Sequence, residues 1–246
     1  MKRLQIFGIT IILSITLTTI TGVYAKEKKE ITTLVTYKKD ITGDNQQDII
    51  EVKGINAGEK FNNLEIDIIT SKNKKYNIPL TGSKKPKVIF KDLNQDGLKD
   101  LFVASSPLEE NENDFHLYSF NDDQFTNIGL PEPLSLTAQF ENNYQASIVI
   151  DKTGNEYTID LKNKRESFER SGLYQNGRLN EPTELLIHSN VQIIPERLKN
   201  MNVGLKIIQP LGESFSGITH ANFVSTWEWR NGRWELRKTV VKAARN

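Results

Sequence analysis

The sequence contains no cysteine and few histidines, and its charges almost cancel. With no cysteine among 246 residues, the chain cannot form a disulfide scaffold, use a cysteine nucleophile, bind zinc through thiolates or carry a lipidated N-terminal cysteine. A formal net charge of +1 excludes the general basic field of a nucleic-acid-binding protein. The histidines, His116, His188 and His220, lack metal-ligand spacing, and no HExxH, GxSxG, P-loop or dinucleotide-binding glycine pattern occurs. We therefore predict a protein that is not an enzyme.

The sequence has only one long hydrophobic run, and this run lies at the N-terminus. Lys2 and Arg3 precede an uncharged run over residues 6–23, and Val23-Tyr24-Ala25 has small residues where signal peptidase cleaves. The sequence predicts a signal peptide over residues 1–25 and a mature domain over 26–246, secreted or held in the cell envelope, with no stable membrane span after cleavage. Because an apolar run of roughly 18 residues is at the short edge for a spanning helix, an uncleaved N-terminal anchor is the alternative.

Two acidic loops with matching spacing are the most informative feature. They read DITGDNQQD and DLNQDGLKD, with oxygen-bearing side chains at positions 1, 3, 5 and 9. Position 6 is Asn45 or Gly97, and both tolerate the left-handed backbone of a tight loop. Ca²⁺ takes six to eight oxygens at ~2.3–2.6 Å, which carboxylates, a neutral oxygen, a carbonyl near position 7 and water can supply. The predicted calcium ligands are Asp40, Thr42, Asp44, Gln46 and Asp48 in the first loop, and Asp92, Asn94, Asp96, Leu98 and Asp100 in the second.

The residues around the loops separate two kinds of calcium site. An EF-hand needs flanking helices and a Glu at position 12, which is Glu51 in the first loop but Val103 in the second. The flanks are short runs of β-branched and aromatic residues, such as Val88-Ile89-Phe90 before the second loop. We therefore predict strand–loop–strand units, with Glu51 a strand side chain. The plainer alternative is that both loops are Asp- and Asn-rich turns without an ion.

This pattern resembles the FG-GAP/VCBS repeat, the calcium-loop repeat of integrin α-subunit propellers and of many secreted bacterial proteins. The second loop with its following Leu-Phe-Val is the closer match, because the first has Thr42 and Asn45 where the repeat has Asp or Asn and Gly. The C-terminal stretches SGLYQNGRLNEP and STWEWRNGRWEL resemble the tail of uncharacterised secreted VCBS-repeat proteins. The resemblance implies propeller blades with Ca²⁺ between their first two strands, and no activity.

The spacing of the acidic loops, and of the hairpins that follow them in the sequence, predicts a repeat of about fifty residues. Asp40 and Asp92 lie 52 residues apart, and each loop precedes a hairpin. The predicted fold is all-β, a small propeller-like array of about four four-stranded antiparallel blades, with one short helix near residues 162–171. The units are residues 31–80, 87–130, 134–161 and 191–242, and the last has lost its acidic ligands. We expect a closed ring rather than an open row, since the chain has no evident caps.

The tryptophans of the last hairpin are the next candidates for a site. With Asn231-Gly232 as a two-residue turn, Trp229 faces Trp234 and Trp227 faces Leu236. Packing between blades is the favoured interpretation, and a platform that binds sugars is the alternative. Trp227, Trp229 and His220 are therefore the speculative ligand-binding residues.

The predicted function is a calcium-binding, non-catalytic binding or scaffold protein outside the cytoplasm, with Ca²⁺ as its cofactor. We expect a monomer whose partner is an unidentified protein or a cell-envelope glycan, and not nucleic acid. A carbohydrate or cell-wall binding module is the first alternative. A hydrolase with a calcium-shaped site is the second, although no carboxylate pair stands out from the loops.

Overall fold

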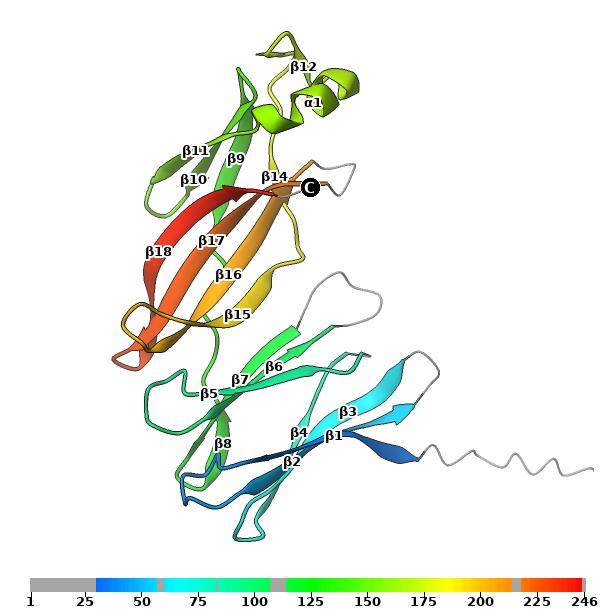
Figure 1. The fold of residues 1–246 in the computed structure, drawn as a ribbon, viewed down its shortest axis with the longest axis vertical. Helices are drawn as coiled ribbons and strands as arrows, with labels where there is room; N and C mark the ends of the chain where they lie inside the picture. The colour runs from blue at the N-terminus through cyan, green and yellow to red at the C-terminus, as the bar shows by residue number, and fades with distance from the viewer. Residues whose placement is uncertain (1–29, 57–59, 83, 107–113, 214–217, 245–246) are drawn as a thin grey trace, which may run out of the picture.

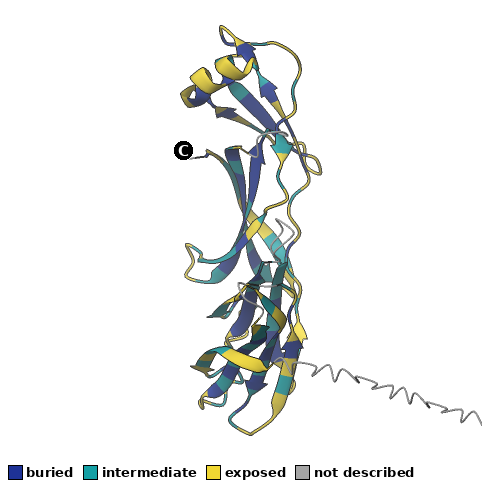
Figure 2. Cartoon of the chain, turned by 90° about the vertical axis from the view of Figure 1, so that its right-hand side faces the viewer, coloured by how far each residue is buried: buried dark blue, intermediate teal, exposed yellow. Residues whose placement is uncertain are grey.

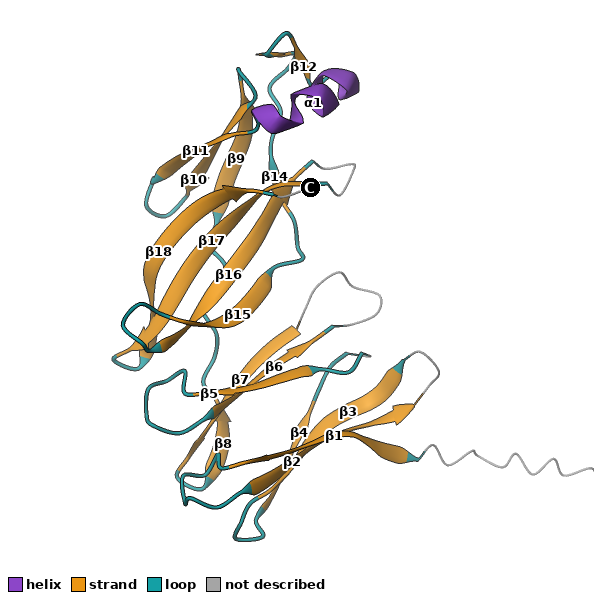
Figure 3. Ribbon diagram, viewed as in Figure 1, coloured by secondary structure: helices purple, strands orange, loops and turns teal. Residues whose placement is uncertain are grey.

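The computed structural model describes residues 30–56, 60–82, 84–106, 114–213 and 218–244. These residues form an all-β protein of several small antiparallel sheets with one short α-helix, as predicted (Figure 3). The predicted signal peptide lies outside the described residues. In the described part of the chain, no helix is both long and apolar enough to cross a membrane.

The first two sheets have the same four-stranded antiparallel order. The first sheet comprises β1 (Ile31–Lys39), β2 (Asp48–Asn56), β3 (Phe61–Ile69) and β4 (Lys75–Pro79). The second comprises β5 (Lys87–Lys91), β6 (Asp100–Ser105), β7 (Asp114–Asn121) and β8 (Gln124–Asn127). In β2 the buried and partly exposed side chains alternate along the strand, because successive residues of a strand point to opposite faces.

The third sheet is smaller and is followed by the helix. It comprises β9 (Leu136–Glu141), β10 (Gln145–Ile150) and β11 (Glu156–Asp160). A 3₁₀ turn, η1 (Lys162–Lys164), leads into α1 (Arg165–Ser171), which confirms the predicted short helix. The helix ends at Gly172, whose φ of +79° is the left-handed conformation that glycine adopts without steric cost. A two-stranded ribbon of β12 (Tyr174–Gln175) and β13 (Arg178–Leu179) follows.

The fourth sheet contains the longest strands. It comprises β14 (Leu186–Ile187), β15 (Gln192–Arg197), β16 (Val203–Gly212), β17 (Thr219–Arg230) and β18 (Arg233–Ala243). The turn between β17 and β18 has left-handed backbones at Asn231 (φ 50°) and Gly232 (φ 76°), as a two-residue hairpin turn requires. Trp229 pairs with Trp234, and Trp227 pairs with Leu236, so the predicted register is confirmed.

Three hydrophobic cores join the sheets face to face. One core lies between the first and second sheets and includes Ile50 and Val103. Another lies between the second and fourth sheets and includes Phe102 and Leu205. The last joins the third and fourth sheets with α1, around Phe168. Buried residues therefore run along the inner faces of successive sheets (Figure 2), in the spatial order first, second, fourth, third.

The described residues form an open row and not the closed ring that we expected. The first and third sheets lie at opposite ends of the molecule (Figure 1), so the contact that would close a ring is missing from the described structure. Strand number also departs from the predicted blades, because only the first two of these sheets have four strands. The fourth sheet accounts for the departure, since the same face packs on the second sheet at one end, around Leu205, and on the third sheet at the other end, around Leu211.

Candidate metal centre

Each acidic loop connects the first two strands of its sheet. The last acid of each loop, Asp48 or Asp100, is the first residue of the following strand and is buried. Oδ2 of Asp100 accepts the backbone N–H groups of Leu93 at 2.7 Å and Asn94 at 3.0 Å. The corresponding oxygen of Asp48 accepts the N–H groups of Ile41 and Thr42, so both loops are closed in the same way.

The flanking strands settle the choice between the two kinds of loop. The loops lie between β1 and β2 and between β5 and β6, with no helix on either side in the described chain. Glu51 lies within β2, and its carboxylate forms an ion pair with Lys53 Nζ at 2.9 Å. The EF-hand alternative is therefore excluded, and Glu51 is a strand side chain as predicted.

Left-handed backbone conformations give the loops their tight curvature. Asn45 and Gly97, the residues at position 6, have φ values of 60° and 91°, as predicted. Position 4 is left-handed as well, with φ of 79° at Gly43 and 62° at Gln95, which the sequence analysis did not anticipate. The first acid of each loop accepts an N–H group across this turn, Asp40 from Asn45 at 2.9 Å and Asp92 from Gly97 at 3.1 Å.

In the first loop, protein donors already occupy the carboxylate oxygens. Oδ1 of Asp48 accepts the backbone N–H of Ser71 at 2.9 Å, and Oδ2 of Asp44 accepts the Ser71 hydroxyl at 2.5 Å. Lys72 Nζ lies 4.0 Å from the same Asp44 oxygen. The hydrogen bond from Ser71 is the main cause that lowers the pKa of Asp44 below its ordinary value. Ser71 is thus a site residue that the sequence analysis missed.

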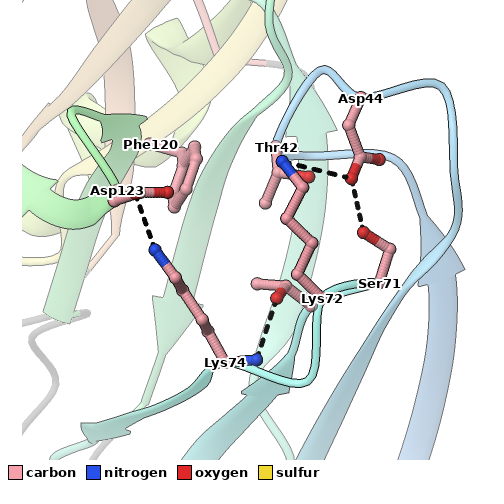
Figure 4. A pocket seen from close by; sticks show the side chains of 8 residues that line it. Thr42, Asp44, Ser71, Lys72, Lys74, Phe120 and Asp123 are labelled. Atoms are coloured by element: carbon pink, nitrogen blue, oxygen red, sulfur yellow. Dashed lines mark hydrogen bonds and ion pairs between the residues drawn. The ribbon is translucent and has the colours of Figure 1, made fainter.

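A small pocket of about 80 Å³ opens beside the first loop. Figure 4 shows Lys72 reaching across it toward Asp44, while Lys74 reaches to Asp123 on the turn between β7 and β8. The Lys74–Asp123 ion pair measures 2.6 Å and joins the first sheet to the second. The pocket is lined by Thr42, Asp44, Thr70, Ser71, Lys72, Lys74, Phe120 and Asp123.

In the second loop, two carboxylate oxygens are buried without a hydrogen-bond partner among the described residues. They are Oδ1 of Asp92 and Oδ1 of Asp100, which we call the orphan oxygens. Asp100 is only 1% exposed. Burial raises the pKa of Asp100 above its ordinary value and the nearby charge of Asp96 raises it further, while the Leu93 and Asn94 amides and the nearby Ser119 hydroxyl oppose this shift. An anionic oxygen that is buried and unpaired is costly unless a cation or a donor reaches it.

The last acid of the first loop receives a backbone N–H on its Oδ1 atom and the last acid of the second loop does not, and the third strand of each sheet explains this difference. In the first sheet β3 ends at Ile69, so the N–H of Ser71 is available to Asp48. In the second sheet β7 continues to Asn121 and pairs with β8 up to that residue. Ser119, which lies on β7, contacts the loop through its hydroxyl, accepting from Asn94 Nδ2 at 2.9 Å and lying 3.4 Å from an Asp96 oxygen.

The predicted ligands are near one another along each loop, but they do not surround a common point. Among the described residues, no group of three or more histidine or acidic side chains is placed to hold a metal ion. The residue at position 7 donates its N–H to the acid at position 5, from Gln46 to Asp44 and from Leu98 to Asp96. Oδ1 of the position-5 carboxylate is therefore engaged by a backbone amide in both loops.

The tryptophans and His220 do not form a common site. Trp227 and Trp234 pack against the core between the second and fourth sheets, and Trp229 contacts Trp234 edge to face at 5.3 Å between ring centroids. His220 is at the other end of β17, where its Nε2 lies 2.9 Å from a Glu213 oxygen and its ring packs on Phe168. Burial lowers the pKa of His220, so the ring is neutral at pH 7.

Comparison with known proteins gave one match. The sequence model of the YybI C-terminal domain family matches residues 134–242, which form the third and fourth sheets and α1. No curated protein and no solved structure matches the chain. The family match overturns the resemblance to FG-GAP/VCBS repeats, because two of the four units assigned to that repeat lie in the residues that match the YybI C-terminal domain model instead. The oxygen spacing that suggested the repeat is a local property of a strand–loop–strand turn and does not define a family.

Proposed function

We propose that this protein is a calcium-binding scaffold or binding protein without catalytic activity, and that the second acidic loop is its principal calcium site. The orphan oxygens of Asp92 and Asp100 are the observation that supports this site. In the first loop, by contrast, Ser71 and the loop amides already satisfy the acids, so an ion there has to displace internal hydrogen bonds. The first loop is accordingly the weaker site.

The proposed ligands of the second loop come from its odd positions. Asp92, Asp96 and Asp100 supply carboxylate oxygens, Asn94 a neutral side-chain oxygen and Leu98 its carbonyl, with water completing the six to eight oxygens that Ca²⁺ takes. The ion reverses the electrostatics of the loop, because crowded carboxylates that repel each other are attracted to a shared cation. The stabilisation is about 1.4 kcal/mol at ~1 mM Ca²⁺ and a Kd of ~0.1 mM.

Two further features support the proposed role as a binding protein and the proposed location outside the cytoplasm. The row of small sheets, which we interpret as units of one propeller-like array, exposes long edges to a partner, whether a protein or an envelope glycan. A glycan is favoured by the half-buried Trp229–Trp234 pair, since aromatic faces stack on sugar rings. Secretion or retention in the envelope rests on the N-terminal hydrophobic run.

Calcium titration with matched variants tests the proposal. Asp96→Asn removes a proposed ligand, and Asp122→Asn removes an acid from the exposed turn after β7 and serves as the control. We expect isothermal titration to show binding in the wild type and in the control, at least tenfold weaker binding in Asp96→Asn, and a melting temperature that EDTA lowers only where calcium binds. Equal affinity in all three proteins would contradict the assignment of the site.

A further inference from the structure

The fourth position of the second loop contacts the neighbouring sheet. Gln95 Nε2 donates a hydrogen bond to the carbonyl oxygen of Trp229 at 2.9 Å. The Oε1 atom of the same side chain accepts a hydrogen bond from Asn202 Nδ2 at 3.0 Å. Asn202 lies between β15 and β16, and Trp229 lies near the end of β17, so Gln95 connects the second sheet to two places on the fourth.

Asn202, one of the two hydrogen-bond partners of Gln95, is itself bound to a buried carboxylate. Asn202 also donates to Oε1 of Glu228 at 2.9 Å, and Glu228 is 1% exposed. The other oxygen of Glu228 forms ion pairs with Arg230 at 2.9 Å and Arg237 at 3.2 Å. A buried carboxylate with donors on both oxygens is a rigid anchor, because leaving either oxygen unpaired is costly.

The fourth position of the first loop makes the corresponding contact. Gly43 has a φ of 79° and lies so close to Leu98 that a Cβ atom added to it would be 2.4 Å from Leu98 Cδ2. The first loop therefore touches the second loop, and the second loop touches the fourth sheet. Along the row, each acidic loop borders the next structural unit through the same loop position.

We propose that calcium in the second loop locks the junction between the second and fourth sheets through Gln95. This inference rests on the proposed calcium site. Gln95 stands between two of the proposed ligands, Asn94 and Asp96, and its left-handed backbone is one that residues other than glycine seldom adopt. An ion that fixes both neighbours fixes this conformation. Without the ion, repulsion between Asp96 and Asp100 loosens the loop, and the side chain of Gln95 leaves its two partners.

The lock acts on the junction and not on the folding of the sheets themselves. The hydrophobic core between the second and fourth sheets includes one buried residue of the loop, Leu93, but its other buried members, such as Phe102 and Leu205, lie on strands and hold the sheets together in either state. Calcium then controls how tightly the matched C-terminal segment, residues 134–242, is fixed to the first two sheets. The measurable consequence is local protection at the junction.

Hydrogen–deuterium exchange of the full chain tests this inference. We expect Ca²⁺, compared with EDTA, to slow exchange by about tenfold in the segments 199–203 and 227–233, which is the factor that a ligand at ten times its Kd produces. Gln95→Ala is expected to abolish this protection while calcium affinity by titration stays within threefold of the wild type. Gln175→Ala, an exposed glutamine on β12 far from the loop, is expected to behave as the wild type.

The outcomes separate the two proposals. Calcium binding without calcium-dependent protection of these segments would overturn the lock and leave the proposed calcium site standing. Protection that persists in Gln95→Ala would also overturn the lock, because another contact would then transmit it. If titration detects no calcium binding to the wild type, the proposed site and the lock both fail.

Discussion

The same isosteric substitution at equivalent positions of the two loops should destabilise the calcium-free protein in the first loop and leave it nearly unchanged in the second. Asp48→Asn and Asp100→Asn each replace one carboxylate oxygen with an NH₂ group at the first residue of a buried strand. In the first loop both oxygens of Asp48 accept hydrogen bonds, with the Ser71 N–H and the Thr42 hydroxyl on Oδ1. In the second loop Oδ1 of Asp100 is an orphan oxygen, so an NH₂ group there breaks no hydrogen bond that the described chain makes to this atom, and the side chain nearby is the Ser119 hydroxyl, which can also accept.

The magnitudes follow from this difference. In Asp48→Asn a donor faces the N–H of Ser71, and losing hydrogen bonds to a charged acceptor costs about 1.5–3 kcal/mol. The corresponding fall in melting temperature is about 3–12 °C for a domain of this size. In Asp100→Asn the amide oxygen still accepts from Leu93 and Asn94, and the charge repulsion with Asp96 is removed. Without calcium, its stability should lie within about 1 kcal/mol of the wild type.

The assay is chemical unfolding of the three proteins in EDTA and in ~1 mM Ca²⁺, the concentration of the estimate above. We expect Asp48→Asn to be destabilised in both conditions and to keep the calcium increment. Asp100→Asn should match the wild type in EDTA and lose the increment of about 1.4 kcal/mol in calcium. The reasoning would be refuted if the two variants were equally destabilised in EDTA, because the second loop would then have no unsatisfied oxygen.

Three further results are expected. Because burial raises the pKa of Asp100 above the unfolded value of 3.8, the stability this group contributes to calcium-free protein is present below that pH and is lost as pH rises through the raised pKa. The urea midpoint of the calcium-free wild type should therefore fall as pH rises through this range. If the midpoint of Asp100→Asn falls just as steeply with pH, Asp100 is not the cause of the pH dependence. Phe102→Ala, in the core between the second and fourth sheets, should lower the unfolding free energy by about 3–5 kcal/mol, and a loss below that of exposed Leu236→Ala would refute the packing. Gly232→Ala should cost about 1–2 kcal/mol from its positive φ alone, since a Cβ atom there has no described atom within 4 Å, and an unchanged melting temperature would argue against the two-residue turn.

Features governed by neighbouring residues were predictable from the sequence. The pair Asn231-Gly232 predicted a two-residue turn between the last two strands, and a turn of this length places Trp234 opposite Trp229. The short helix followed from a charged run that ends at Gly172. The strands around both loops followed from their β-branched and aromatic residues, because such side chains pack well on a pleated sheet.

Features governed by distant residues were not predictable. Ser71 contacts Asp44 across 27 positions, and no local pattern marks a serine that will supply a hydrogen bond to a loop of another hairpin. Gln95 meets its partners on the fourth sheet across more than a hundred positions. The oxygen spacing of the two loops made their acids candidate calcium ligands, but it did not show that protein donors satisfy one loop and leave the other with the orphan oxygens.

The packing of the fourth sheet on two neighbours has a consequence for biosynthesis. Residues 186–243 follow the second and third sheets in chain order, yet they supply the apolar surface that covers one face of each. Until this last segment has been synthesised, both earlier sheets expose hydrophobic side chains to solvent, and neither half of the molecule reaches its final packing. Nascent chains shorter than this are therefore the forms most in need of chaperones, and a deletion within β16 or β17 would damage both ends of the protein at once.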